Sequence, residues 1–260
     1  MKKKLFFFIV AFIVLVAGGI ICCRQKETVP VTYICTPFKH VKIRGRFPAF
    51  APNGKYKWSQ NTVIMVYFYD GATPVANRIV RIANEWHQYG NISFRLTPYL
   101  YNAMVKVSFA AKGYGSAIGK ECVQPEYDTD PSMYLQGMDT LRDPVVFRRI
   151  VLHEFGHVLG LEHEFSNPTV AIKWDSTEVY KYYLKYNNWD TAMVDQQIFK
   201  RLDPENKDYS EFDSTSIMIY AVAPPLIKGP AIPWPSGLST TDKKGISIWY
   251  PLNYKQTIHN

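Results

Sequence analysis

One stretch of eleven residues decides the fold of this chain, His153-Glu154-Phe155-Gly156-His157-Val158-Leu159-Gly160-Leu161-Glu162-His163. Three histidines, a glutamate and a glycine fall here on a fixed spacing, although the 260 residues contain only six histidines. Chance would produce this spacing on the order of once in 10⁵ chains of such composition. The pattern therefore indicates a functional site.

Helical geometry explains the spacing. Residues four apart lie on one face of a helix, so His153 and His157 can direct ring nitrogens at the same ion. Glu154 is placed to reach a water on that ion. Gly160 can adopt the left-handed conformation that ends a helix, which lets the chain turn and bring His163 back as a third ligand. Three imidazoles suit zinc and leave a fourth position open, so we predict one catalytic zinc ion per chain.

The predicted chemistry is amide hydrolysis. Water on zinc has its pKa lowered from 15.7 to about 7, so Glu154 can take its proton, promote attack on a carbonyl and later protonate the departing amine. The alternative is a structural site that only fixes a helix to a loop. Structural sites more often have four protein ligands, frequently cysteine, and have no need for Glu154.

The sequence around the motif predicts one mixed α/β domain over residues 56–255, without the boundary of a second hydrophobic core. Asp143 is a suitable N-cap with Pro144 at the first helical position, so the histidines lie on a helix that runs to Leu159. Further helices are predicted at Pro74–Tyr89, Asp175–Tyr186, Asp190 to about Leu202, and Ser239 to Pro251. Strands are predicted at Thr62–Tyr69, buried on both faces, at Ile92–Leu96 and Met104–Phe109, both half-buried, and at Ser132–Gln136.

Charge is distributed unevenly along the chain. The net charge is +8, but residues 1–57 hold 11 basic residues and a single acid, Glu27, so the remainder has a net charge of −2. A nucleic-acid-binding protein should carry its basic stripe on the folded domain. We therefore expect no nucleic-acid partner.

The N-terminus has the order of an export signal. Lys2, Lys3 and Lys4 precede an uncharged apolar run from Leu5 to Ile21. We predict that residues 1–23 are a signal with a lipid or membrane anchor, that 24–55 are a tether or short pro-segment, and that the protein acts outside the cytoplasm. Cys22 and Cys23 are candidates for lipid attachment, although Ile21 is bulkier than the residue usual at that place. An uncleaved anchor and free secretion are the alternatives, and any membrane contact is expected through this segment only.

Two cysteines remain, Cys35 and Cys122. An even pair in an oxidising compartment predicts a disulfide. The alternative is that Cys35 caps the metal site as a latency switch.

The histidine motif and the later segment Asp213–Tyr220 (DSTSIMIY) together resemble the metzincin clan of zinc endopeptidases, most closely the astacin-type family. The resemblance implies a zincin domain with a mixed twisted sheet, an active-site helix and a mostly helical or irregular C-terminal subdomain. It implies that Met218 forms the methionine turn below the metal and that Tyr220 is a labile extra ligand that stabilises the oxyanion. Glu164, directly after His163, also matches the family.

The chain departs from the family pattern at two places. Ile219 replaces the usual histidine between Met218 and Tyr220, and Asn167-Pro168 stand where an arginine-bearing stretch is usual. Neither touches the predicted ligands, but both leave the subfamily and the peptide preference open. The resemblance also implies that Ser132–Gln136 forms the sheet edge where an extended peptide docks by strand addition.

The leading hypothesis is an extracytoplasmic zinc endopeptidase acting on extended protein segments. One alternative is a degenerate metzincin domain that serves as a surface binding or adhesion module. Intact Glu154 and Tyr220 argue against this degeneration. Another alternative keeps the zinc chemistry but applies it to a non-peptide amide or a cell-wall bridge.

Overall fold

The computed structural model describes residues 56–70, 73–203 and 209–252, all within the compact unit Thr32–Asn260. The predictions for residues 1–55, including those for Cys22, Cys23 and Cys35, lie outside the described residues. Among the helices that are described, none combines the length and the apolar character needed to cross a membrane.

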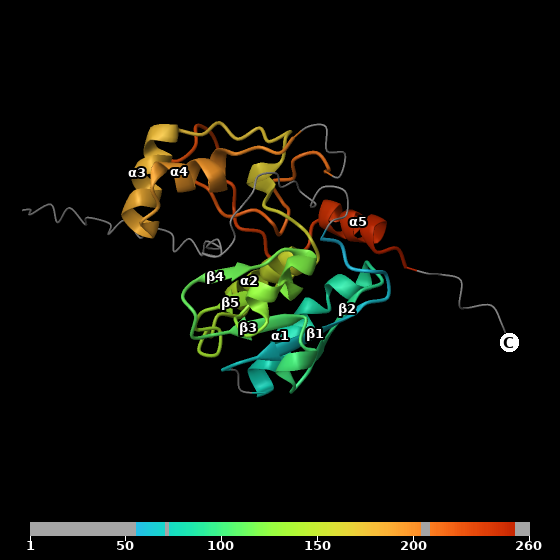
Figure 1. Ribbon diagram of the computed structural model, residues 1–260. Coiled ribbons are helices and arrows are strands. Elements are labelled where there is room, and N and C mark those ends of the chain that lie inside the picture. The colour runs from blue at the N-terminus through green and yellow to red at the C-terminus, as the bar shows by residue number, and fades with distance from the viewer. Residues whose placement is uncertain (1–55, 71–72, 204–208, 253–260) are drawn as a thin grey trace, which may run out of the picture. The chain divides into compact units, whose positions relative to one another are not determined.

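A five-stranded mixed sheet forms one layer, in the order β2-β1-β3-β5-β4 (Figure 1). Neighbouring strands are parallel except for β4, which runs antiparallel to β5. The predicted mixed α/β class is confirmed. The strands are β1 (Val63–Phe68), β2 (Ser93–Leu96), β3 (Val105–Ser108), β4 (Tyr114–Ser116) and β5 (Met133–Leu135).

The edge strand differs from the prediction. β5 lies inside the sheet between β3 and β4, so the edge is β4 rather than Ser132–Gln136. β4 was not predicted because its three residues are too short to show alternation. Gly113 before β4 and Gly119 after it have positive φ values of 95° and 52°. Glycines at such positions are typical of loops, so the sequence of this stretch predicts a loop.

Burial of the central strands also differs from the prediction. In β1, Ile64 and Val66 are fully buried while Val63 is exposed, so only one face is completely covered. All four residues of β3 are buried, including Lys106, although alternation predicted a half-buried strand. The 3-10 turn Gly119–Val123 contacts β3, so the face that carries Lys106 is covered as well.

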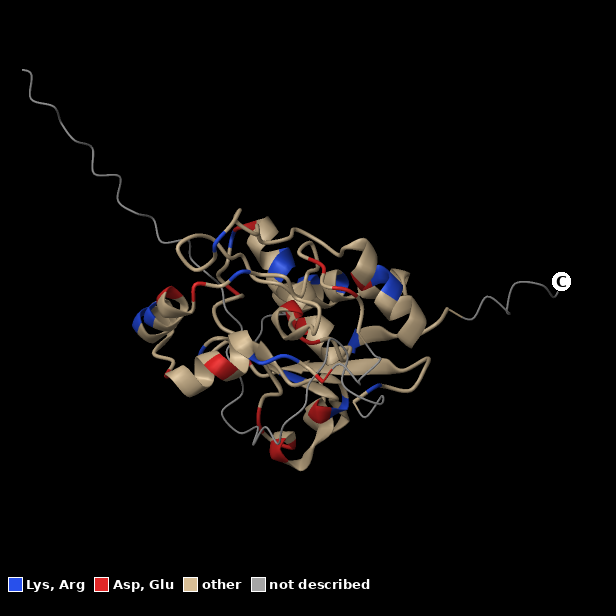
Figure 2. Cartoon of the chain, turned by 90° about the horizontal axis from the view of Figure 1, so that it is seen from above, with Lys and Arg blue, Asp and Glu red and all other residues tan. Residues whose placement is uncertain are grey.

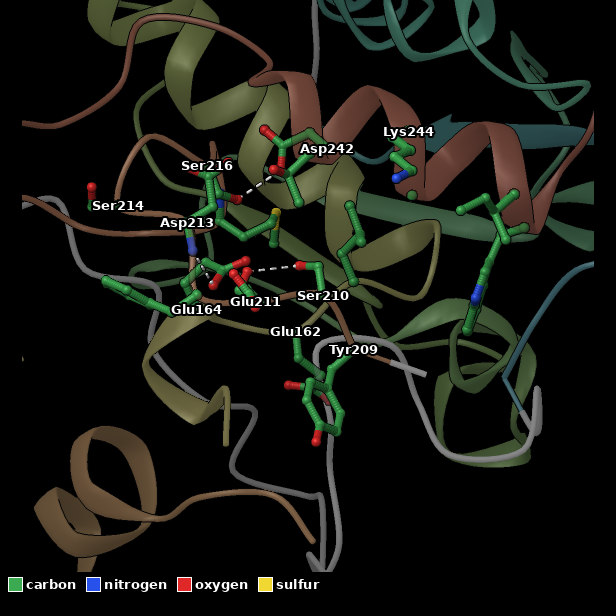
Figure 3. Close-up of a pocket in the computed structure, with 17 residues that line it drawn as sticks. Glu162, Glu164, Tyr209, Ser210, Glu211, Asp213, Ser214, Ser216, Asp242 and Lys244 are labelled. Carbon is green, nitrogen blue, oxygen red and sulfur yellow. Dashed lines mark hydrogen bonds between the residues drawn. The ribbon is translucent and has the colours of Figure 1, made fainter. Parts of the chain in front are cut away.

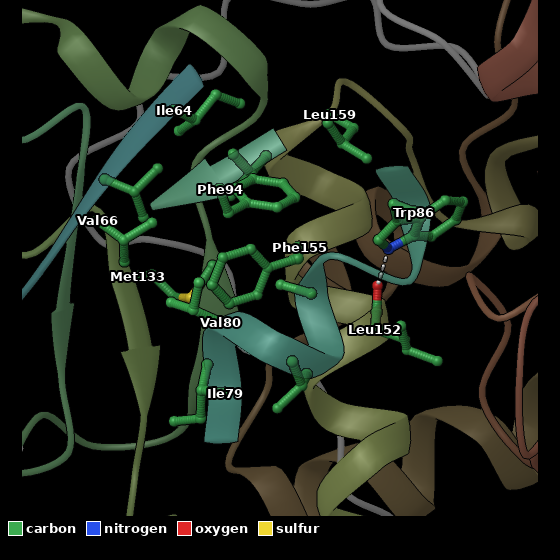
Figure 4. Packing of buried hydrophobic residues seen from close by; sticks show 14 of the residues in the cluster. Ile64, Val66, Ile79, Val80, Trp86, Phe94, Met133, Leu152, Phe155 and Leu159 are labelled. Carbon is green, nitrogen blue, oxygen red and sulfur yellow. Dashed lines mark hydrogen bonds between the residues drawn. The ribbon is translucent and has the colours of Figure 1, made fainter. Parts of the chain in front are cut away.

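Two helices pack with the sheet to form the main core. Side chains of α1 (Thr73–Ala83) and α2 (Pro144–Val158) meet those of the strands, as Figure 4 shows for Ile79, Phe155 and Phe94. The chain after α1 forms a separate 3-10 turn at Trp86–Gln88 instead of the continuous helix predicted to Tyr89. The buried Trp86 indole donates a hydrogen bond to the Leu152 carbonyl at 3.1 Å, which ties this turn to α2.

The start of α2 is confirmed as predicted. The Asp143 carboxylate accepts hydrogen bonds from the backbone N–H groups of Val145 and Val146 at 2.8 and 3.0 Å, and Pro144 occupies the first turn. The cap fixes where the helix begins, and hence which face carries the histidines.

The C-terminal half contains α3 (Ser176–Asn187), α4 (Thr191–Val194) with a following π turn (Asp195–Phe199), and α5 (Thr240–Trp249). The predicted caps Asp175, Asp190 and Ser239 all accept backbone hydrogen bonds. Basic and acidic side chains are scattered over the surface of the described chain (Figure 2), and one pair of them, Lys181 and Glu178 of α3, forms an ion pair at 2.8 Å.

This half has its own hydrophobic cluster, which lies within the same compact unit as the main core. The cluster escapes sequence inspection because many of its residues lie in irregular segments without periodicity. Its buried members are Phe165, Val179, Tyr183, Trp189, Val194, Ile198, Ile219, Tyr220, Val222, Leu226 and Ile227.

Candidate active site

Helix α2 presents His153 and His157 with defined ring orientations. Nδ1 of His153 lies 2.8 Å from the Ile217 carbonyl, and Nδ1 of His157 lies 2.7 Å from the Leu161 carbonyl. A carbonyl can only accept, so each Nδ1 carries the ring proton and each Nε2 carries the lone pair of its ring.

Gly160 lets the chain reverse after α2. Its φ of 99° is left-handed, and the backbone N–H groups of Gly160 and Leu161 donate to the carbonyls of His157 and Gly156. A Cβ at this position would lie 3.0 Å from the Trp249 ring, so the space as well as the backbone angle favours glycine. The reversal brings His163 next to the helix.

The three histidines converge. One ring nitrogen from each of His153, His157 and His163 lies within 4.8 Å of the others, and the Nε2 atoms of His157 and His163 are 3.0 Å apart. Nε2 of His153 is buried and has no hydrogen-bond partner among the described residues. Burial lowers the pKa of His153 to about 3 and of His157 to about 4, and it also holds the pKa of His163 well below its usual value. Three neutral imidazoles with facing lone pairs fit a zinc ion.

Tyr220 and Glu154 complete the site. The Tyr220 hydroxyl lies 2.5 Å from Nε2 of His163, and its ring is buried against the Phe165 ring. Glu154 follows His153 on α2 and is 2% exposed, so its carboxylate is almost wholly removed from bulk water. A buried carboxylate and a phenolic hydroxyl thus accompany the histidine cluster.

Met218 lies directly against α2. A Cβ on Gly156 would be 2.5 Å from the Met218 sulfur, so the sulfur contacts the helix backbone where the helix carries no side chain. The Met218 carbonyl also accepts a hydrogen bond from the Glu164 N–H at 3.1 Å. These contacts place the methionine turn against the segment that follows His163.

Two buried carboxylates hold the methionine turn, and sequence reasoning assigned neither of them this role (Figure 3). Asp242 of α5 accepts from the Ser216 hydroxyl at 2.7 Å, from the Ile217 N–H at 2.9 Å and from the Ser239 N–H at 2.8 Å. Glu164 accepts from the Asp213 N–H at 3.2 Å. Burial raises the pKa of both groups, to about 8 for Glu164. Asp242 was predicted only to help cap α5.

A pocket of about 630 Å³ borders this turn and carries several carboxyl groups (Figure 3). Glu162 and Glu164 contribute to its lining from the chain segment around His163, and Asp242 from α5. Burial, with a smaller effect of Glu121, raises the pKa of Glu162 well above its usual value. The two carboxylates that hold the methionine turn, those of Glu164 and Asp242, therefore also line the pocket.

Cys122 is a buried free thiol that donates a hydrogen bond to the Ala117 carbonyl at 3.4 Å. The disulfide predicted with Cys35 stays a prediction, because Cys35 lies outside the described residues, and the Cys122 side chain is enclosed in the main core. Burial raises the pKa of this thiol to about 12.

Comparisons with known proteins place these observations in context. No known family profile matches the chain, and no curated protein matches its sequence. Among solved structures, one of myroilysin is 34% identical with a TM-score of 0.71, and the match covers 76% of this chain and 97% of myroilysin. A second myroilysin structure is 31% identical with a TM-score of 0.60, over 86% of this chain and 93% of the other.

A third solved structure is high choriolytic enzyme 1, a hatching-enzyme zinc protease from Oryzias latipes (medaka fish). It is 17% identical with a TM-score of 0.50, over 76% of this chain and 96% of the other, and this likeness shows the fold alone. The likeness to myroilysin extends over nearly its whole length and accompanies the three-histidine cluster. The chain therefore belongs to the astacin-type metzincin family of zinc metalloendopeptidases, with a single zinc ion as its cofactor.

Proposed function

We propose that this chain cleaves extended protein segments outside the cytoplasm, with Glu154 as general base and Tyr220 as oxyanion donor. The observation that carries the proposal is the convergence of three neutral imidazoles beside a buried carboxylate and a phenolic hydroxyl. In this assignment the Nε2 atoms of His153, His157 and His163 hold the zinc. Bound there, zinc would acidify a water and polarise the peptide carbonyl.

Glu154 moves the proton in this mechanism. Its carboxylate accepts a proton from the attacking water and then delivers it to the nitrogen of the leaving amine. Burial supports this role because it keeps bulk water away from the carboxylate during the proton transfer.

Tyr220 stabilises the negative charge that develops on the carbonyl oxygen. Its hydroxyl lies 2.5 Å from Nε2 of His163, so it is within one hydrogen-bond length of the ligand set. In the mechanism it donates to the oxyanion as charge forms there.

The substrate docks along β4. Within the described sheet, β4 has a neighbouring strand on one side only, and it contacts α2, which carries two of the histidines. An extended peptide can add a strand to such an edge through backbone hydrogen bonds. Folded proteins present few extended segments, so we expect flexible or unfolded regions to be cut first.

The N-terminal sequence supports action outside the cytoplasm. Residues 1–23 would direct export, with attachment of lipid at Cys22 or Cys23, and residues 24–55 would tether the catalytic domain. Radiolabelled palmitate should enter the wild-type protein but not a Cys22→Ser/Cys23→Ser variant. If the wild-type protein is not labelled, lipid attachment is excluded and the two alternatives are an uncleaved anchor and free secretion.

The decisive experiment is Glu154→Gln. Casein cleavage should fall by about 10²–10⁴-fold because the base is lost, while zinc content by plasma mass spectrometry stays at one per chain. Glu126→Gln, at an exposed carboxylate, is the matched control and should retain activity. Full activity in a zinc-loaded Glu154→Gln protein would refute the mechanism. Zinc-loaded wild type inert towards a broad peptide library would favour a binding module.

A further inference from the structure

The C-terminal end of α2 leads into the turn that brings His163 back to the helix. A helix end leaves its last carbonyls without partners inside the helix. Here the carbonyls of residues 155–157 accept backbone N–H groups of residues 159–161, at 2.8 to 3.1 Å. The next two carbonyls, those of Val158 and Leu159, accept hydrogen bonds from side chains. The turn is therefore held partly by groups outside its own backbone.

Both of these side-chain donors come from distant parts of the sequence. The Trp58 indole donates to the Val158 carbonyl at 2.7 Å across 100 positions, and the Tyr250 hydroxyl donates to the Leu159 carbonyl at 2.9 Å across 91 positions. The Tyr250 hydroxyl also accepts the Trp58 backbone N–H at 3.3 Å, so the two donors are joined. Trp58 is 4% exposed and Tyr250 is 0% exposed, so water has little access to replace a lost bond.

The turn controls the placement of two of the histidines. The Leu161 carbonyl, two residues after Leu159, accepts Nδ1–H of His157 at 2.7 Å, so its position decides how that ring is oriented. His163 follows two residues later. A displacement of the Leu159 carbonyl would be passed through Gly160 to both rings, because one short stretch of backbone connects them.

We propose that Tyr250 and Trp58 are positioning residues for the zinc site. By binding the last two carbonyls of the turn, they hold the backbone in the form that directs Nε2 of His157 and of His163 at one ion. Burial raises the pKa of the Tyr250 hydroxyl, which therefore keeps its proton for this bond. The inference rests on the proposed function, because it adds positioning residues to the same zinc site.

Tyr250→Phe tests the inference because it removes the hydroxyl and keeps the ring. The zinc dissociation constant, measured by competition with a fluorescent chelator, should rise about tenfold. In cobalt-substituted protein the visible absorption bands should shift, since the ligand geometry changes. At saturating zinc, kcat should fall about tenfold with KM unchanged. Tyr69→Phe, which removes a hydroxyl that donates to the Thr129 carbonyl, is the matched control and should keep the wild-type values.

Thermal unfolding separates this role from a purely structural one. The inference is overturned if Tyr250→Phe lowers Tm but leaves the zinc affinity and the cobalt spectrum as in the wild type. If this variant does not fold, Trp58→Phe takes its place, since it removes the indole donor and keeps an aromatic ring, and the same result would overturn the inference. Neither metal measurement needs turnover, so both decide the inference even if no peptide is cleaved and the proposed function fails.

Discussion

At the scale of single residues, the Tyr220 side chain has two roles, one for its ring and one for its hydroxyl. The ring is buried in the second hydrophobic cluster, while the hydroxyl reaches Nε2 of His163. Tyr220→Phe keeps the packing and removes only the donor, so kcat should fall by about 10²–10³-fold with KM little changed. Steady-state kinetics with parallel measurement of zinc content checks this. An unchanged kcat would show that Tyr220 is a packing residue.

Cys122 provides a second prediction at this scale. With a pKa of about 12 in the folded chain against 9.0 for an ordinary thiol, it should react with iodoacetamide at pH 8 about a thousandfold more slowly than in guanidinium chloride. Peptide mapping by mass spectrometry distinguishes it from the other cysteines. Since the unfolded thiol loses its proton first as pH rises, Cys122 also lowers folding stability between pH 9 and 12. Rapid labelling of the native protein would contradict the enclosed position.

At the scale of elements, the methionine turn is positioned from α5. Asp242 accepts the Ile217 N–H, and the carbonyl of the same Ile217 accepts Nδ1–H of His153. The carboxylate therefore orients His153, a proposed zinc ligand, through one intervening residue.

Removal of the Asp242 carboxylate should weaken zinc binding. Asp242→Ala leaves the Ile217 and Ser239 N–H groups without their acceptor, so the zinc dissociation constant should rise about 10–100-fold. Competition with a fluorescent zinc chelator measures this change. Asp139→Ala, at an exposed carboxylate, is the control. Equal zinc affinity in both variants would show that Asp242 serves α5 alone.

The elements differ in how well the sequence predicts them. α2 was predictable because its start and end are encoded locally, by Asp143-Pro144 and by Gly160. β4 was not, because three residues carry no period and their pairing with β5 is decided by the fold. Asp242 is predictable in one role only. Its capping of α5 follows from the local sequence, but its contact with Ile217 joins residues 25 positions apart and depends on the fold.

At the scale of the whole molecule, the site connects two hydrophobic clusters. Leu152 and Phe155, beside the first histidines on α2, belong to the main core, whereas Phe165 and Tyr220, near His163, belong to the second. Zinc coordinated by all three histidines would link these clusters. Sequence inspection could identify the three histidines but not this division, because much of the second cluster lies in irregular segments.

Metal removal should therefore lower the stability of the whole domain. A ligand present at a thousand times its dissociation constant adds about 4 kcal/mol to the folded state, so 1,10-phenanthroline should lower Tm by roughly 10 °C. Differential scanning fluorimetry before and after zinc is restored measures this shift. A Tm independent of zinc would mean that the two clusters hold together without the ion.

The position of the site between two clusters has a consequence for biosynthesis. In a newly made chain the active site forms only after both hydrophobic clusters have formed and packed together. Neither half of the domain holds all the active-site residues by itself. A partly folded chain therefore does not cleave neighbouring proteins. Proteolytic activity appears only when the whole domain has folded.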